Sequence, residues 1–422
     1  MKILKARWVL PINRPAFQEG AVVIEEGQII DVGIAAEILP KYSEAEVEDF
    51  PSCALLPGLV NAHTEVDLLF FRPTGETPQF FDGLIHTWNH RRCLTPAQRR
   101  HAYEEGIRQL LRSGTTTMGD SGCYVGVVAQ IVNSPIRAVL FPEILSGQPT
   151  AVSDSYESVM SQVDEILAAV STSQGLVNAG VAPYAAYTLS RHLLKVLAEQ
   201  SRRLNIPLKI HAAETFSEMQ FFYESNGEIV EKIFPLMQWG SDFPPPYRKT
   251  PIQYLDSIGF FEGGGAVIGG NNLADPDLEV LARQKMTLIH CPRASHRFKL
   301  GIPPLKKLRQ LHIAVTLGTG GTAWAHSLSL WDEMRHILTH YSEPSKPSPD
   351  ELLSMVTLEG ARALGLENLV GSLEVGKEAD LIAISLPQKE SFDSSNLAKG
   401  LIENTTDREV AAIFIRGQKI KL

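Results

Sequence analysis

The chain has 422 residues, of which 44% are hydrophobic and 21% charged, a composition typical of a folded globular protein. Its formal net charge is -9, and no Lys/Arg-rich block occurs, which argues against nucleic acid or an anionic membrane surface as the main partner. The composition therefore favours a small-molecule ligand, neutral or cationic.

The N-terminal residues 1–7 lack the apolar core of a signal peptide, and no run of ~18 apolar residues could cross a bilayer. The four cysteines are dispersed without a C-x-x-C pair, so neither a disulfide framework nor a structural zinc site is indicated. They are Cys53, Cys93, Cys123 and Cys291. We expect a cytoplasmic protein.

The chain divides into three segments with different patterns of predicted secondary structure. Residues 1–57 alternate short β-rich runs with turns, which predicts part of a small β-sandwich. Residues 58–370 alternate short apolar strands with helical stretches, and residues 371–422 return to strands and turns that would rejoin the first sheet. The predicted barrel strands begin at Leu59 and continue at 115–118, 138–141, 176–181, 208–211, 266–268, 286–290 and 313–317. The fold class predicted is α/β, a (β/α)8 TIM-like barrel with a β-sandwich built from both termini.

The first barrel strand ends in His63-Thr64-Glu65, after an apolar run broken by Pro57-Gly58. Residues i and i+2 of a strand face the same side, so a His-x-His here would direct two imidazoles at one metal ion. In this chain the second imidazole is replaced by a carboxylate, which makes the metal the open question.

Six motifs in chain order carry a resemblance. They are 57–63 (PGLVNAH), 113–117 (SGTTT), 211–214 (HAAE), 290–293 (HCPR), 317–319 (LGT) and 371–380 (GSLEVGKEAD). Together they resemble the amidohydrolase superfamily, its deaminase and chlorohydrolase branch, and especially the aminofutalosine deaminase-like proteins. Those proteins carry a Pro-Arg-Ser-His element, which here reads Pro-Arg-Ala-Ser-His over 292–296, with one extra residue.

The resemblance implies one divalent metal held by His-x-His on strand 1, a His on strand 5 and an Asp on strand 8. It also implies that a strand-5 Glu and a strand-6 His move protons. The chain retains His63, His211 and Glu214 in the matching positions.

Four positions depart from the implied pattern. Glu65 replaces a His, Tyr184 replaces a His of a substrate-contact element, and glycines stand where the strand-6 His and strand-8 Asp are expected, at Gly269 and Gly320. The eighth-strand Asp would neutralise the ion and accept a proton from its water, so Gly320 alone removes both contributions. The two glycines either open the pocket to a bulkier or anionic group or are relics of a lost activity.

Two interpretations of the surviving residues stay open. In the first, His63, Glu65 and His211 hold one ion, zinc or iron, with Glu214 and Glu65 as the catalytic carboxylates. In the second, no metal is bound and Glu65 pairs with an Arg or Lys at the barrel mouth. In either case the resemblance implies substrate contacts from Tyr184 and from a set further along the chain, which consists of His290, Arg293 and His296.

Two functions follow from these interpretations. The first is a hydrolase of non-peptide C–N bonds that deaminates a purine-like or related heterocycle through an altered metal site. The second is a metal-free, inactive paralogue that binds a small molecule or a protein. The family resemblance also implies a homodimer, and neither nucleic acid nor a membrane is expected as a partner.

Overall fold

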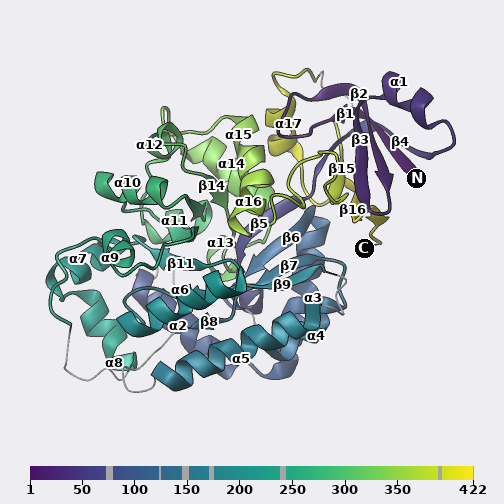
Figure 1. Cartoon of the computed structure of the whole chain (residues 1–422). Coiled ribbons are helices and arrows are strands. Elements are labelled where there is room, and N and C mark those ends of the chain that lie inside the picture. Colours follow the sequence, from purple (N-terminus) through teal and green to yellow (C-terminus); the bar gives the residue numbers. More distant parts are fainter. Residues whose placement is uncertain are drawn as a thin grey trace.

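A computed structural model describes residues 1–72, 79–122, 125–144, 152–170, 175–237, 244–387 and 392–421. Its larger part is a parallel barrel, seen at the centre of Figure 1, with most helices around it. Two four-stranded sheets make the barrel, in the orders β5-β6-β7-β9 and β11-β12-β13-β14. The strands are β5 (Leu59–Thr64), β6 (Thr115–Asp120), β7 (Arg137–Leu140), β9 (Val177–Ala179), β11 (Lys209–Ala212), β12 (Gly265–Gly269), β13 (Met286–His290) and β14 (Val315–Leu317).

Two isolated bridges close these sheets into a ring. Val181 pairs with Leu208 between the ends of the two sheets, and Thr64 pairs with Gly320 on the opposite side. A short parallel pair, β8 (Glu143–Ile144) and β10 (Ala182–Pro183), extends the wall beyond β7 and β9. All barrel pairs are parallel, as the predicted β-α alternation requires. The predicted barrel fold is confirmed.

The helices of the barrel part begin at strong sequence signals. Thr95 caps α3 (Pro96–Arg112) in a reciprocal capping box with Gln98, and Ser190 caps α6 (Arg191–Leu204). The others are α2 (Phe80–Cys93), α4 (Val128–Val132), α5 (Val152–Val170), α7 (Phe216–Glu224), α8 (Phe234–Met237), α9 (Pro251–Ser257), α10 (Asp275–Arg283), α11 (Pro292–Phe298), α12 (Leu305–Gln310), α13 (Thr322–Ala325), α14 (Leu330–His340), α15 (Pro349–Met355) and α16 (Leu358–Ala363).

Both ends of the chain build the second part, which lies beside the barrel in Figure 1. Its seven-stranded sheet has the order β17-β16-β15-β4-β1-β2-β3. Apolar side chains from six of these strands meet in one core, so the sheet curls over itself as a small sandwich. The strands are β1 (Lys2–Val9), β2 (Phe17–Glu25), β3 (Gln28–Ile34), β4 (Glu46–Pro57), β15 (Leu381–Ser385), β16 (Val410–Ile415) and β17 (Gln418–Lys419), joined by α1 (Ala35–Ile38) and α17 (Leu397–Asn404).

A buried arginine ties the barrel to the sandwich. Arg137 on β7 donates from Nε to Asp380 at 2.9 Å and also pairs with Glu378, both just before β15. Burial opposes the charge on Arg137, but the two carboxylates outweigh it and raise its pKa. Because both partners are largely buried, this contact fixes the sandwich against the barrel base.

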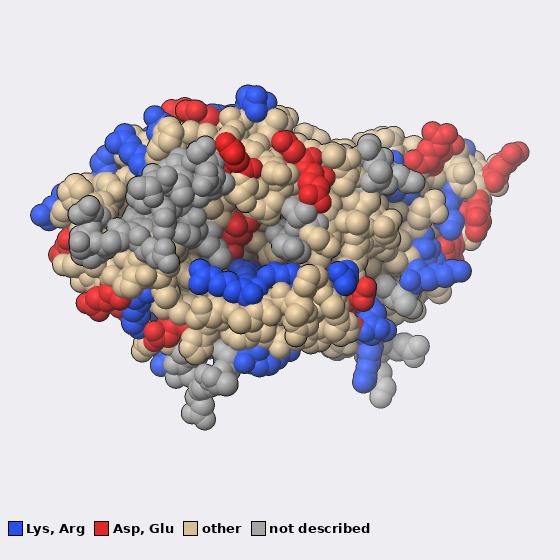
Figure 2. Space-filling model, turned by 90° about the horizontal axis from the view of Figure 1, so that it is seen from below, with Lys and Arg blue, Asp and Glu red and all other residues tan. Residues whose placement is uncertain are grey.

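Two smaller expectations can be placed on the fold. Cys53, Cys93 and Cys291 are free thiols, and Cys123 lies outside the described residues. In the described part of the chain, every helix is too short or too polar to cross a membrane. On the face drawn in Figure 2, acidic side chains lie beside a short row of basic ones, without a continuous basic surface.

Candidate active site

A cavity opens at the carboxyl ends of the barrel strands, where enzymes of this architecture place their chemistry. It encloses about 650 Å³, part of which is open solvent at its mouth. Polar groups gather at its base and apolar side chains form its walls. The lining residues are His63, Glu65, Phe80, Leu84, Thr87, Tyr184, His211, Glu214, Ile268, Gly269, Cys291, Ala294, Ser295, Phe298, Leu300, Gly320 and Trp324. The structure thus brings together seven of the ten candidate residues identified in the sequence.

His211 and Glu214 form a polar pair on the cavity wall. His211 is the last residue but one of β11, and its Nδ1 lies 3.1 Å from Oε2 of Glu214, three residues further on. Burial disfavours a charged imidazole, but Glu214, Glu143 and Glu65 outweigh it and raise the pKa of His211. The backbone of Glu214 is itself held, since its N–H donates to Glu218 at 3.0 Å and its carbonyl accepts from Asn272 at 2.8 Å. A carboxylate and an imidazole are therefore fixed together where a ligand would lie.

Glu65 does not point freely into the cavity, because α2 delivers a buried arginine to it. Arg91 donates from Nη2 to Oε1 of Glu65, from Nε to Asp67 and from Nη1 to Glu143, each at 2.8 Å. Burial works against the charge of Arg91, but the three carboxylates outweigh it and hold its pKa well above the usual value. Burial also raises the pKa of Glu143 to about 7, against the opposing effect of Arg91.

His63 is buried beside this cluster and has its own partner. Its Nδ1 lies 3.2 Å from the hydroxyl of Ser121, and its ring packs edge-on against that of His211 with 5.1 Å between centroids. Burial, followed by the nearby cations Lys209 and Arg91, lowers the pKa of His63 well below its usual value. A neutral imidazole is thus expected at neutral pH.

These residues do not converge as a metal site. In the described part of the chain, a single group of three His, Cys, Asp or Glu side chains has its ligand atoms within 4.8 Å of one another, and it does not include His63, Glu65 or His211. One carboxylate oxygen of Glu65 already binds a guanidinium. The full positive charge of Arg91 stands beside the carboxylate that would have to bind the ion, and like charges repel strongly at low dielectric. The structure therefore does not assemble the His2Glu ligand set expected from the sequence. It agrees with the alternative interpretation, in which Glu65 pairs with an arginine.

The two glycines differ in what they allow. A Cβ on Gly269, whose φ is +98°, would lie 2.3 Å from Cγ of Glu214, so no imidazole fits there while Glu214 holds its position. Gly320 has a φ of +58°, and a Cβ there would meet only Oε2 of Glu65, at 3.8 Å. Glu214 can therefore occupy its position only because residue 269 has no side chain, whereas a side chain at position 320 would have room.

Aromatic side chains form the walls. Tyr184 lies where the resemblance implied a His, and its ring stacks on that of His211 at 4.7 Å with an interplanar angle of 26°. Elsewhere in the lining Phe298 packs on Trp324 with 4.6 Å between ring centroids, and Phe80 packs edge-on against Phe298. A flat heterocycle could stack on these rings, and its polar edge could then form hydrogen bonds with the polar groups of the cavity, such as Glu214.

Three expected substrate contacts are not part of the cavity lining. Arg293 instead pairs with Glu333 at 2.8 Å and with Ser327 and Asp332. His290 is buried with its Nε2 2.5 Å from the hydroxyl of Tyr341, and burial lowers its pKa to about 3. His296 is exposed on α11, and Ala294 and Ser295 of the same helix line the cavity instead.

The residues missed in the sequence come from α2, from the turn after β5 and from β8. Arg91 stands between His90 and Arg92 in a helical segment, where a solvated side chain is the usual expectation, and Asp67 and Glu143 lie in no motif. Only a requirement for a counter-charge to Glu65 could have pointed to an arginine, without saying which.

Comparison with known proteins identifies the family of this chain. A model of the amidohydrolase family matches residues 54–420. The 5-methylthioadenosine/S-adenosylhomocysteine deaminases of Thermodesulfovibrio yellowstonii and Caldanaerobacter subterraneus are 28% and 29% identical, over 98% of this chain and 92% and 91% of their own lengths.

Solved structures agree with this assignment. Helicobacter pylori aminofutalosine deaminase in complex with methylthio-coformycin superposes with a TM-score of 0.88 at 22% identity, over the whole of both chains. A zinc-bound adenosine deaminase from Xanthomonas campestris gives a TM-score of 0.83 at 22% identity, over 99% of this chain and 92% of that one. At these identities the likeness establishes the fold alone. The match to the family model over most of the sequence, together with the barrel-mouth site, shows that the chain belongs to the amidohydrolase family.

Proposed function

We propose that this protein is a hydrolase of C–N bonds that deaminates a purine-like nucleoside bound in the barrel cavity. The observation that carries the proposal is the paired His211 and Glu214, fixed on the wall of a cavity with aromatic faces. Membership of the amidohydrolase family and the deaminases among the relatives support the same reaction class.

In the proposed reaction the heterocycle lies between the aromatic walls with its amino-bearing carbon towards Glu214. Glu214 takes a proton from a water molecule as the oxygen adds to that carbon, and gives this proton to the ring nitrogen. It then takes the remaining proton from the added hydroxyl group and gives it to the departing amine. The C–N bond then breaks, and the products are the keto heterocycle and ammonia. His211 keeps the Glu214 carboxylate in place through their contact.

No step is assigned to a metal, because the residues at the barrel mouth do not fit one. Glu65, expected in the catalytic set, acts in this proposal through Arg91, whose charge it balances. The guanidinium also pairs with Asp67 and Glu143, so the cluster keeps these buried carboxylates paired without a bound ion.

The test uses 5′-methylthioadenosine, S-adenosylhomocysteine and adenosine as probes, with release of ammonia as the measurement. Glu214→Gln should abolish release, since an amide cannot accept the proton, while Glu224→Gln on the exposed end of α7 should leave it unchanged. Treatment with a chelator should also leave it unchanged. Release that persists in Glu214→Gln would refute the assignment.

A second candidate function is binding without turnover, and the Arg91–Glu65 ion pair favours it. If the Arg91–Glu65 pair replaces a catalytic ion, the cavity can still bind a ligand, but it lacks the Lewis acid that would activate water. Micromolar binding of the same nucleosides in a calorimeter, with no ammonia released over hours, would support this candidate. A homodimer and a cytoplasmic location also remain predictions, and light scattering tests the first.

A further inference from the structure

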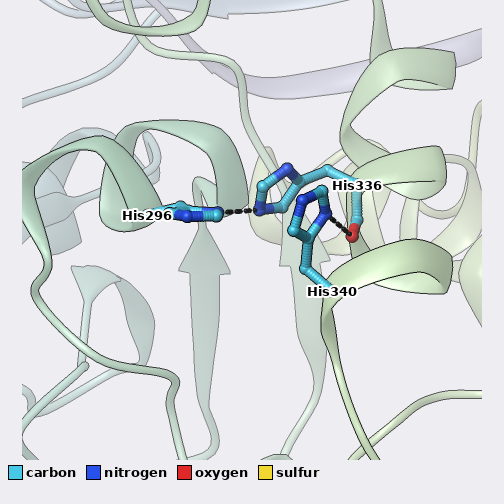
Figure 3. Close-up of side chains that lie close together, drawn as sticks. All are labelled: His296, His336 and His340. Carbon is cyan, nitrogen blue, oxygen red and sulfur yellow. Dashed lines mark hydrogen bonds between the residues drawn. The ribbon is translucent and has the colours of Figure 1, made fainter.

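Three histidines from two helices lie together outside the barrel cavity. His336 and His340 stand one turn apart at the end of α14, and His296 faces them from α11 (Figure 3). One ligand nitrogen from each residue lies within 4.8 Å of the other two, a group that the described part of the chain forms only here. His296 and His340 are exposed and His336 is half-buried, so the group is open to solvent.

Two of the ring nitrogens are close enough to share an ion, but the rings of His336 and His340 are stacked with 4.1 Å between centroids, so one of the two has to turn before both bind it. Nδ1 of His296 and Nε2 of His336 lie 3.0 Å apart. Two imidazole nitrogens bound to one tetrahedral zinc at about 2.0–2.1 Å would be about 3.3 Å apart, so a small outward shift makes room for the ion.

The third histidine is already oriented. Nδ1 of His340 lies 3.1 Å from the backbone carbonyl of His336, and since a carbonyl can only accept, this nitrogen carries the proton. The lone pair is therefore on Nε2. A backbone carbonyl bound to the far nitrogen is the usual way in which a metal-binding histidine is held.

We propose that His296, His336 and His340 form a binding site for a divalent transition-metal ion of the zinc class, separate from the barrel cavity. Imidazole ligands select Zn²⁺, Ni²⁺ or Cu²⁺ over Mg²⁺ and Ca²⁺, and three histidines leave a fourth position for water. The site does not depend on the proposed deamination.

Its place in the fold gives the ion a structural role. The ion would link α11 to α14, and α11 also carries Ala294 and Ser295 of the cavity wall. Arg293 on the same helix already contacts Glu333 on α14. The metal would thus strengthen a contact that sets the position of one wall of the cavity.

The test is a Zn²⁺ titration of the full-length chain after chelator treatment and dialysis, with bound zinc measured at equilibrium. We expect one zinc per chain, an affinity at least tenfold weaker in His336→Ala and in His340→Ala, and no change in His192→Ala, an exposed histidine on α6. His211→Ala should also bind one zinc, which separates this site from the barrel. Circular dichroism of each variant without zinc checks that the fold is intact.

Either of two outcomes would overturn the proposal. The first is the absence of zinc binding to the wild-type chain at 100 μM free zinc, on the order of the weakest affinity that a specific site would show. The second is binding of equal strength in the wild type and in His336→Ala with His340→Ala combined, which would place the zinc elsewhere.

Discussion

Replacement of Arg91 by methionine tests the ion cluster at the barrel mouth. Methionine has a similar length but leaves Glu65, Asp67 and Glu143 without their shared cation. Removing one partner of a buried ion pair costs about 3–5 kcal/mol, because the remaining charge stays buried. Arg91 serves three carboxylates, but Glu143 is partly protonated at neutral pH because burial raises its pKa to about 7. We therefore expect a loss of about 4 kcal/mol at pH 7.

The loss should depend on pH in a definite direction. Burial already raises the pKa of Glu143 to about 7 against the opposing effect of Arg91, so without the guanidinium this folded-state pKa rises further above that of the unfolded chain. The folded state then holds more protons than the unfolded state over the interval between the two values, so its stability falls as pH rises through that interval. The difference between Arg91→Met and the wild type should be smaller at pH 5 than at pH 8.

The measurement is urea unfolding at pH 5, 7 and 8, followed by circular dichroism. The matched control is Arg283→Met, because Arg283 forms one exposed ion pair with Asp256 and should cost less than about 1 kcal/mol. A loss at Arg91 as small as at Arg283, or a loss that grows towards acid pH, would show that the cluster does not carry a buried positive charge.

Three further predictions follow. Gly269→Ala should lower the free energy of unfolding by about 1–3 kcal/mol and displace Glu214, because its Cβ would lie 2.3 Å from Cγ of Glu214. The control is Gly376→Ala, which has a φ of +91° but no atom within 4 Å and so reports the backbone cost alone. Equal urea midpoints for the two variants would contradict the clash. Burial lowers the pKa of Lys209 to about 7, against the effect of Asp120 and Glu143. Between about pH 7 and 10 the unfolded chain therefore binds more protons than the folded chain, so the free energy of unfolding rises with pH in that interval. Lys209→Met should remove that rise in urea midpoints between pH 7 and 9, and an unchanged slope would argue against a neutral Lys209. Glu65→His combined with Gly320→Asp should create a barrel zinc site only when Arg91→Gln also removes the competing cation. The measurement is the zinc content per chain, in a His336→Ala background. Zinc binding by the variant that keeps Arg91 would refute the role of Arg91 in excluding the ion.

Much of the fold could be predicted because barrel strands are short apolar runs between amphipathic helices. The seven later runs predicted from the sequence coincide with β6, β7, β9, β11, β12, β13 and β14 within a few residues. The first run ends at the His63 motif, so the carboxyl ends of the strands, and with them the place of the cavity, followed from the motif order. The contribution of both termini to one sheet was visible in the return of strand texture after residue 371.

The chemistry of the site could be predicted only in part. His211 and Glu214 lie in one short motif, and their contact follows from three residues at a strand end. Arg91 comes from a helix whose orientation depends on tertiary packing, so its contact with Glu65 has no local signal. Gly269 stands where a histidine was expected, but its φ is positive and a Cβ there would lie 2.3 Å from Cγ of Glu214, which the sequence does not reveal.

The outward turn of His296 shows why a motif does not fix a contact. An extra residue within a helix turns the side chains that follow it by about 100°, because a helix has 3.6 residues per turn, so the letters of a motif alone do not say which side a residue faces. His336 and His340 lie four residues apart on one helix, but their neighbour His296 lies 40 residues before His336, so no local pattern connects the three. The proposed zinc site therefore needed the three-dimensional structure.

Ammonia release from a purine nucleoside tests the proposed function most directly. Purified chain, treated with a chelator and dialysed, should release ammonia from 5′-methylthioadenosine or adenosine in proportion to enzyme concentration, and Glu214→Gln should release none. Saturable binding of these nucleosides without ammonia from the wild-type chain would contradict hydrolysis and leave the barrel as a binding site.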